Sequence, residues 1–217
     1  MCIFFGLIKL LQYKWRMNKK VTKGEMMVDI RKPTNEEVKK YLKQWEDLKN
    51  YVNQENSLNK LFFDLIPENK QIEDILIKCS TLNDFYSTNI FSIFPVAKHI
   101  YELDIDERLK EFDLTLVNDI AEVNELNRRF YSFASKYCSH HNPEQFPIYD
   151  NYVDKVLRYF RRVDKFASFK NEDLKDYVKF KTILDEFKVY YSLNQYSLKD
   201  LDRYLWILGK EHFQKQY

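Results

Sequence analysis

The segment FYSFASKYCSHHNPEQFPIYDNYVDKVL, residues 130–157, contains the pattern that best predicts the fold of this chain. Its first part has the composition of a helix that carries Lys136, and a turn rich in His, Asn and Pro follows. Asp150 stands just before an apolar pattern with helical spacing that includes Val153 and Val156. The segment therefore predicts two helices joined by a turn, with a lysine on the first and an aspartate at the start of the second.

Helical spacing continues on both sides of this segment. Thr34 followed by Glu37 predicts a capped helix start, and Gly209 after Leu208 is typical of the residue that follows a helix end. Trp206 is predicted to pack in the core, and the alternative is that it stacks on a base or a helix. Apolar stripes are found at 38–45, 58–65, 72–85, from about Pro95 to 101, 120–137, 153–160, 180–187 and 198–208.

The fold class follows from the stripes and from the scarcity of glycine. The 217 residues include only three glycines, with none between Gly24 and Gly209. Tight β-hairpins and phosphate-binding loops need glycine at positions with positive φ, which argues against a β-sandwich, a P-loop and a dinucleotide-binding fold. We predict an all-α, compact multi-helix domain over residues 26–217. It forms either one globular unit or two helical lobes, roughly 33–117 and 118–217, with a cleft between them.

The N-terminal residues 1–25 are predicted to be a non-native or disordered extension. The apolar run at 2–11 is short and is broken by Lys9, so it fits neither a membrane span nor a signal peptide. The codons for residues 23–27 can contain a purine-rich ribosome-binding sequence, which predicts that translation starts at Met26 or Met27. The alternative is a short amphipathic anchor.

The cysteines exclude several kinds of site. Cys2, Cys79 and Cys138 are far apart and form no CxxC pair. A structural zinc site, an iron–sulfur cluster and a disulfide framework are therefore not expected. Reduced cysteines predict a cytoplasmic protein, and we expect neither a metal nor an organic cofactor.

Charge is distributed unevenly along the chain. Residues 1–25 contain six Lys or Arg and one acid, so a chain with a formal charge of +2 has −3 over residues 26–217. Residues 128–170 contain nine basic and four acidic residues, a local excess of +5. Such a patch either faces the phosphates of a nucleic acid or is a solvated amphipathic face. The basic residues proposed to contact DNA are Arg128, Arg129, Lys155, Arg158 and Arg162.

Lys136 and Asp150 are the candidate catalytic residues. On a continuous helix, Arg129, Phe133, Lys136 and His140 share one face. A lysine beside aromatic rings and other cations can have its pKa lowered, which frees the amine as a nucleophile. The alternative for Lys136 is a solvated surface lysine. Asp150 is predicted to cap the following helix, which also fixes a carboxylate where it can stabilise a cationic sugar.

His140 and His141 stand beside the same turn. With Asp150 they suggest a metal site, but no third ligand has a motif spacing. A loop pair that forms hydrogen bonds with the turn is the preferred prediction. We also assign both histidines, with Tyr149, to the predicted substrate-binding surface.

The segments FASKYC (133–138) and FPIYD (146–150) resemble the lysine-to-aspartate segment of the helix–hairpin–helix DNA glycosylases, particularly the 8-oxoguanine glycosylase branch. The resemblance implies that Lys136 attacks C1′ of a flipped nucleotide and that Asp150 assists the departure of the base. It also implies a two-lobed helical fold that binds DNA. The hairpin of that family uses glycines, whereas residues 124–135 have none, and the lysine-to-aspartate interval is shorter here.

Two functions follow from these observations. The first is a DNA glycosylase, with or without lyase activity, that excises a damaged or modified base. The second is a non-catalytic helical module that binds nucleic acid or protein in a bacterial defence or mobile-element system. The hairpin without glycine and the modest net charge favour the second.

Overall fold

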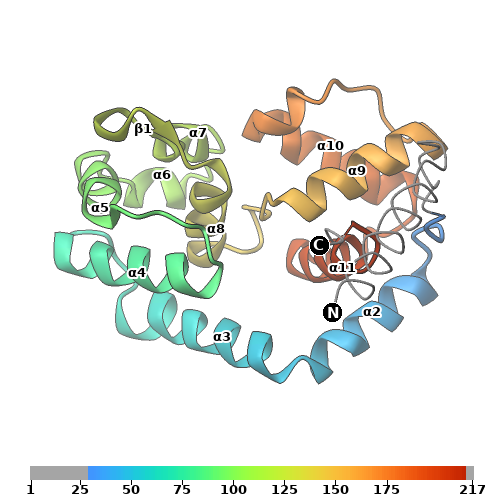
Figure 1. The fold of residues 1–217 in the computed structure, drawn as a ribbon, viewed down its shortest axis with the longest axis horizontal. Coiled ribbons are helices and arrows are strands. Elements are labelled where there is room, and N and C mark those ends of the chain that lie inside the picture. Colours follow the sequence, from blue (N-terminus) through green and yellow to red (C-terminus); the bar gives the residue numbers. More distant parts are fainter. Residues whose placement is uncertain (1–28, 214–217) are drawn as a thin grey trace, which may run out of the picture. The chain divides into compact units, whose positions relative to one another are not determined.

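The computed structural model describes residues 29–213, and helices α2 to α11 belong to one compact unit that starts at Arg31 (Figure 1). The fold is all-α, as predicted. The prediction about residues 1–25 lies outside the described residues. The helices are α2 (Asn35–Asp47), α3 (Lys49–Asn59), α4 (Ile72–Phe85), α5 (Ile93–Glu102), α6 (Asp106–Lys110), α7 (Leu116–Ala121), α8 (Tyr131–His141), α9 (Asn151–Asp164), α10 (Tyr177–Tyr190) and α11 (Leu198–Phe213).

Shorter elements connect these helices. A π-helical turn, η1 (Lys60–Leu65), continues α3, and 3₁₀ turns η2 (Asn124–Leu126) and η3 (Asp173–Lys175) precede α8 and α10. Strands β1 (Glu122–Val123) and β2 (Arg128–Arg129) form one antiparallel pair. Within residues 29–213 no helix is long and apolar enough to cross a membrane.

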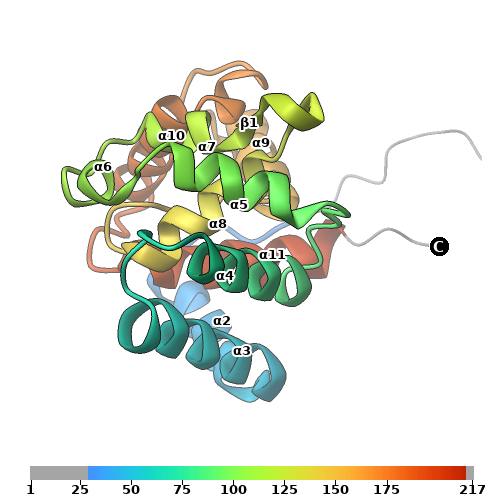
Figure 2. The same cartoon turned by 90° about the vertical axis from the view of Figure 1, so that its left-hand side faces the viewer.

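The helices form two groups that α3 connects (Figure 1), and Figure 2 shows α3 alongside α4. In one group α4 packs against α5 and α8, and α7 packs against α8. In the other, α11 packs against both α9 and α2. Because α2 lies with α9 and α11, and α8 lies with α4, the helices group across the expected boundary between residues 117 and 118.

The predicted helix starts are confirmed where they depend on local capping. The Thr34 hydroxyl accepts a hydrogen bond from the Glu37 backbone N–H at 3.2 Å, and α2 begins at the next residue. The helix buries Val38 and Tyr41, as its apolar spacing predicts. Gly209 does not follow a helix end, however, because α11 continues to Phe213.

The stripe at 120–137 is not one helix. Helix α7 ends at Ala121, and β1 pairs with β2 through the partners Glu122 with Arg129 and Val123 with Arg128. Asn127 makes the reversal possible with a left-handed backbone (φ 47°), which asparagine tolerates better than most residues. The chain therefore runs helix, hairpin, helix, and a non-glycine residue occupies the left-handed position.

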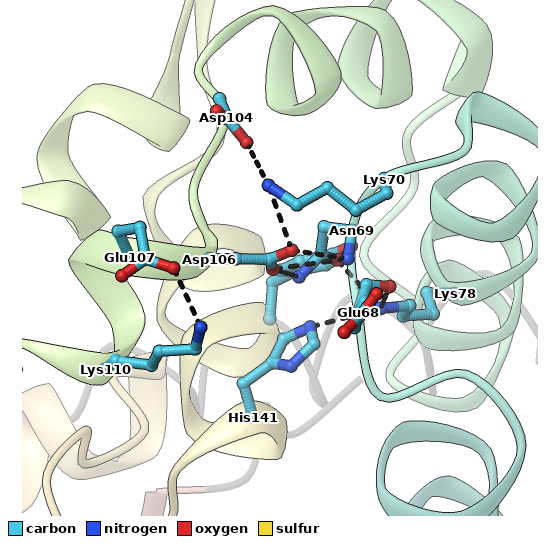
Figure 3. A network of polar contacts seen from close by, with 10 residues as sticks. Glu68, Asn69, Lys70, Lys78, Asp104, Asp106, Glu107, Lys110 and His141 are labelled. Atoms are coloured by element: carbon cyan, nitrogen blue, oxygen red, sulfur yellow. Dashed lines mark hydrogen bonds and ion pairs between the residues drawn. The ribbon is translucent and has the colours of Figure 1, made fainter.

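A polar network fixes the last turn of α8 (Figure 3). The fully buried Lys78 Nζ donates to the Glu68 carbonyl and to the Asn69 Oδ1, both at 2.8 Å. Asn69 donates to Asp106 through its backbone N–H (3.0 Å) and its side-chain amide (2.6 Å). The His141 Nε2 lies 3.4 Å from the Lys78 Nζ. The network joins α4, α6 and α8, so the helix that carries the candidate lysine is fixed at its C-terminal end.

Candidate active site

Lys136 and Asp150 line one cavity of about 620 Å³. Its wall is formed by α3, the end of α4, the start of α8, the start of α9 and α11, so residues far apart in sequence surround it. The volume is within the range of about 300–1,000 Å³ that small-molecule sites occupy. The charged residues of the lining are Glu55, Arg129, Lys136, Asp150, Lys199, Asp202, Arg203 and Lys210.

Lys136 is not a solvated surface lysine, since only 4% of it is exposed. Its Nζ donates to the Ser132 hydroxyl at 2.6 Å and to the Ser132 carbonyl at 3.3 Å, and it lies 5.1 Å from the centre of the Tyr86 ring. No carboxylate within residues 29–213 forms an ion pair with it. Burial lowers the pKa of the amine, and the more distant charges of Asp150 and Asp202 only partly oppose this.

Asp150 caps helix α9. Its Oδ1 accepts from the backbone N–H groups of Tyr152 (2.7 Å) and Val153 (3.0 Å), which confirms the predicted N-cap. The preceding chain is also fixed, because the Ser135 hydroxyl accepts from the Tyr149 N–H at 3.1 Å. Ser135 lies on α8 next to the candidate lysine, so this contact holds the two candidate residues on the same side of the turn.

Asp202, which no sequence pattern indicated, lines the cavity from α11. It is half-buried, and it forms no hydrogen bond or ion pair with any residue that the structure describes. Its pKa is raised to about 6, chiefly by desolvation and in smaller part by the charge of Asp150, and the charge of Lys199 opposes the rise. The site thus contains a second carboxylate close to the lysine.

Glu55 holds two cations at the same edge. Its carboxylate lies 2.8 Å from the Lys199 Nζ and 2.8 Å from an Arg203 Nη, and the residue is only 7% exposed. Burial acts to raise the pKa of Glu55, but the charges and hydrogen bonds of the two cations outweigh it and lower the pKa. An ionised carboxylate therefore orders the polar side of α11 that faces the cavity.

Aromatic rings form another part of the wall. The Trp206 ring lies 4.9 Å from Tyr51 and 6.0 Å from Trp45, and the Lys210 Nζ lies 4.6 Å from its centre. The prediction that Trp206 packs in the core is wrong, since its side chain is only partly buried and lines the cavity. Gly209, one turn further, lets α11 approach α9 closely. A wall of this kind can stack on a flat ring.

Arg128 and Arg129 belong to the hairpin rather than to α8. The prediction that Arg129 shares a helix face with Lys136 is wrong, because α8 begins only at Tyr131. The Arg129 guanidinium lines the cavity, but it is bound to Glu122 at 2.6 Å and to the Lys175 carbonyl at 2.8 Å. Arg128 is exposed on β2. Arg129 therefore fixes the hairpin next to the cavity.

The two histidines lie in the last turn of α8, so the prediction of a loop pair is wrong. His140 is buried behind the cavity wall, where its Nε2 lies 2.9 Å from the Tyr86 hydroxyl. His141 lies on another side of the helix, against Lys78 and a second cavity of about 210 Å³. Burial lowers the pKa of both rings well below the usual value, so both are neutral at pH 7.

The remaining predicted residues do not line the cavity. Tyr149 packs against the rings of Tyr131 and Phe180, with its ring centre 4.6 Å and 5.4 Å from theirs. The other three residues, Lys155, Arg158 and Arg162, lie on α9. Lys155 donates to the Phe213 carbonyl at 3.5 Å, and Arg158 pairs with Asp154 at 2.7 Å. The Arg162 guanidinium lies over the Tyr159 ring. Their contact with DNA stays a prediction.

Residues 29–213 contain no group of three or more His, Cys, Asp or Glu arranged to hold a metal.

Residues 37–145 match the family HI_0787_N, which is described as an N-terminal domain. The chain belongs to this family. It is 53% identical over 147 residues to a Haemophilus influenzae protein described as uncharacterized, a match that covers 66% of this chain and 70% of that protein. No solved structure matches. The family segment includes Lys136 and ends before Asp150, so α9 and α11 supply the rest of the cavity from outside it.

Proposed function

We propose that this chain is a DNA glycosylase that excises a damaged or modified base through an amine nucleophile. One observation carries the proposal: a buried lysine with a lowered pKa opens into the same cavity as a fixed aspartate. A buried lysine beside an aromatic ring, with no ion pair to any residue from 29 to 213, has the environment that activates an amine. The sequence resemblance, and the succession of α7, the β1–β2 hairpin and α8, also support it.

The proposed reaction uses only residues of this chain. The Lys136 Nζ attacks C1′ of a nucleotide flipped out of the duplex. The glycosidic bond breaks, and its electron pair leaves with the base. The Asp150 carboxylate stabilises the positive charge that develops on the sugar. The aromatic wall at Trp206 and Tyr51 offers a stacking surface, worth about 1–3 kcal/mol for a base. No metal or organic cofactor is required.

Borohydride trapping tests the proposal, because reduction of the lysine–sugar imine leaves a stable cross-link. The substrates are duplex oligonucleotides with different base lesions, and one with an abasic site. We expect a cross-link with the wild type and none with Lys136→Gln. Lys60→Gln, at an exposed position, is the matched control and should cross-link normally. Absence of a cross-link on every substrate would eliminate the lyase reaction, and normal trapping by Lys136→Gln would eliminate this assignment.

The alternative is a non-catalytic helical module that binds nucleic acid or protein, within a bacterial defence or mobile-element system. The hairpin favours it, since the left-handed position is Asn127 rather than glycine and the Arg129 side chain is already bound within the protein. Salt-dependent DNA binding without release of any base would support this function. Absence of binding at low salt would leave a protein-interaction module. Under either function the buried free thiols of Cys79 and Cys138 are consistent with the proposed cytoplasmic location.

A further inference from the structure

Asp202 differs from the other two carboxylates that line the cavity. Asp150 accepts two backbone N–H groups, and Glu55 is bound to Lys199 and Arg203. Asp202 has no hydrogen bond or ion pair with any described residue, although it lines the cavity. Protonation of Asp150 or Glu55 would weaken existing contacts, whereas Asp202 can take up a proton without losing one. Its side chain is therefore free to act on something inside the cavity.

The groups around Asp202 come from five helices. Lys199 and Arg203 lie on its own helix α11, Glu55 lies on α3, Tyr86 ends α4, Lys136 lies on α8, and Asp150 caps α9. Lys136 and Asp202 interact electrostatically, since each charge shifts the pKa of the other. Lys136 and Asp202 therefore influence each other's protonation rather than titrating independently.

We propose that Asp202 takes the proton from the Lys136 ammonium group as the site closes on DNA, which leaves the amine free to attack. The proposal rests on the glycosylase function above. An N–H bond of Lys136 breaks, and an O–H bond forms on Asp202, directly or through one water. The nitrogen lone pair then forms the bond to C1′ while the glycosidic electron pair leaves with the base. Asp202 finally donates the same proton to a nitrogen of that base, so no other reactant is needed.

Electrostatics of the cavity make this transfer less costly than it is in water. The ordinary pKa values of lysine and aspartate are 10.5 and 3.8, so the proton normally stays on the amine. Here burial lowers the pKa of Lys136 and raises the pKa of Asp202 to about 6. Each pKa unit that separates the two groups makes the transfer tenfold less favourable. Burial therefore acts on both partners in the direction that favours a neutral pair.

Competitive labelling tests the coupling of the two residues without any DNA. Acetic anhydride acylates neutral amines, and mass spectrometry reports the pH at which Lys136 becomes reactive. We expect Asp202→Asn to lower that pH by about one unit, because an anion that favours the ammonium form is lost. Asp185→Asn, which removes a carboxylate paired with Lys181 on α10, is the matched control and should leave it unchanged. No change with Asp202→Asn would overturn the proposal.

Single-turnover borohydride trapping on an abasic oligonucleotide, from pH 5 to 9, tests the proton transfer. We expect the wild-type rate to rise as pH passes about 6, where Asp202 becomes ionised. Asp202→Asn should lose this limb and react about 100-fold more slowly at pH 7, with recovery as hydroxide removes the proton at higher pH. Asp202→Glu should keep the acidic limb because it retains a carboxylate.

The outcomes separate this inference from the proposed function. If the wild type forms a cross-link and Asp202→Asn has the same profile and rate, the proton transfer is overturned while the glycosylase function stands. A uniform decrease with an unchanged pH profile would show a merely structural role and also overturns it. If the wild type forms no cross-link at any pH, both proposals are overturned.

Discussion

Gly209 of α11 lies against Tyr152 of α9, so closely that a Cβ added to Gly209 would lie 2.6 Å from the Tyr152 Cβ and 2.9 Å from its carbonyl oxygen. Two non-bonded carbon atoms do not approach to 2.6 Å without displacement. The contact joins the first turn of α9, which Asp150 caps, to the helix that carries Asp202 and Trp206. Glycine at this position therefore sets the distance between two walls of the cavity.

Gly209→Ala should destabilise the protein. Alanine favours a helix by about 1 kcal/mol over glycine, but overpacking typically costs about 1–3 kcal/mol. The atoms in the way belong partly to the backbone of α9, so we expect the second effect to win by up to about 2 kcal/mol. Urea unfolding measures the difference. Glu186→Ala, at an exposed helical position, should change stability by no more than about 0.5 kcal/mol. A Gly209→Ala protein as stable as the wild type would contradict this role.

The sequence predicted what depends on neighbours along the chain. The caps at Thr34 and Asp150 need only a side-chain oxygen and the next turn of helix, and both are confirmed. The break after Ala121 was missed because apolar spacing continues through the hairpin and because Asn127 takes the left-handed position without glycine. Local signals therefore located the helix starts and not every interruption.

The parts of the site that were missed depend on contacts between distant segments. Asp202 falls on the polar positions of α11, and nothing local indicates that this face meets a cavity rather than solvent. Trp206 follows the apolar pattern of α11, yet it is only partly buried, with its ring against Tyr51 of α3. Gly209 stands inside a helix, where its role appears only from the approach of Tyr152. The roles of these three residues in the cavity are set by the packing of α3, α9 and α11 against one another.

Asp150 combines a cap with a charge, and two substitutions separate them. Asn is nearly as good a cap as Asp, so Asp150→Asn should keep most of the stability, whereas Asp150→Ala should lose about 1 kcal/mol. If the charge stabilises the sugar cation, both variants should trap the oligonucleotide far more slowly than the wild type. Urea unfolding and borohydride trapping measure the two effects. Trapping by Asp150→Asn at the wild-type rate would contradict the role of the charge.

Glu55→Gln should destabilise the protein at pH 7 by about 3 kcal/mol, because it leaves Lys199 and Arg203 without their shared carboxylate. This destabilisation is at the low end of the range for a broken buried ion pair, because the Lys199 and Arg203 side chains are 17% and 28% exposed. The pKa of Glu55 is lowered on folding, so its stabilisation is present above the ordinary value of 4.5 and is lost as pH falls through the folded value.

Urea unfolding at pH 7 and at pH 3.5 therefore checks the Glu55 prediction. The difference between the wild type and Glu55→Gln should be largest at pH 7 and should shrink at pH 3.5. Glu186→Gln, which removes an exposed carboxylate of α10, should show no such dependence. A difference that stays constant down to pH 3.5 would mean that Glu55 is not held ionised by its two partners.

Because Lys78 is buried, we expect the free energy of unfolding to rise with pH above about 8. Burial lowers its pKa from 10.5 to about 8, so between these values the unfolded chain holds a proton that the folded protein has released. The free energy of unfolding then increases with pH, by at most about 1.4 kcal/mol per pH unit for one proton. Lys78→Met should lack this contribution, and groups common to both proteins cancel in the comparison.

Urea unfolding of the wild type and Lys78→Met at pH 7.5, 8.5 and 9.5 measures this contribution. The wild type should gain stability relative to the variant at each step. Lys60→Met is the matched control, because Lys60 is exposed in the π-helical turn and should parallel the wild type. Parallel curves for Lys78→Met and the wild type would show that Lys78 keeps its proton when buried. The network in Figure 3 would then contain a charged lysine throughout this pH range.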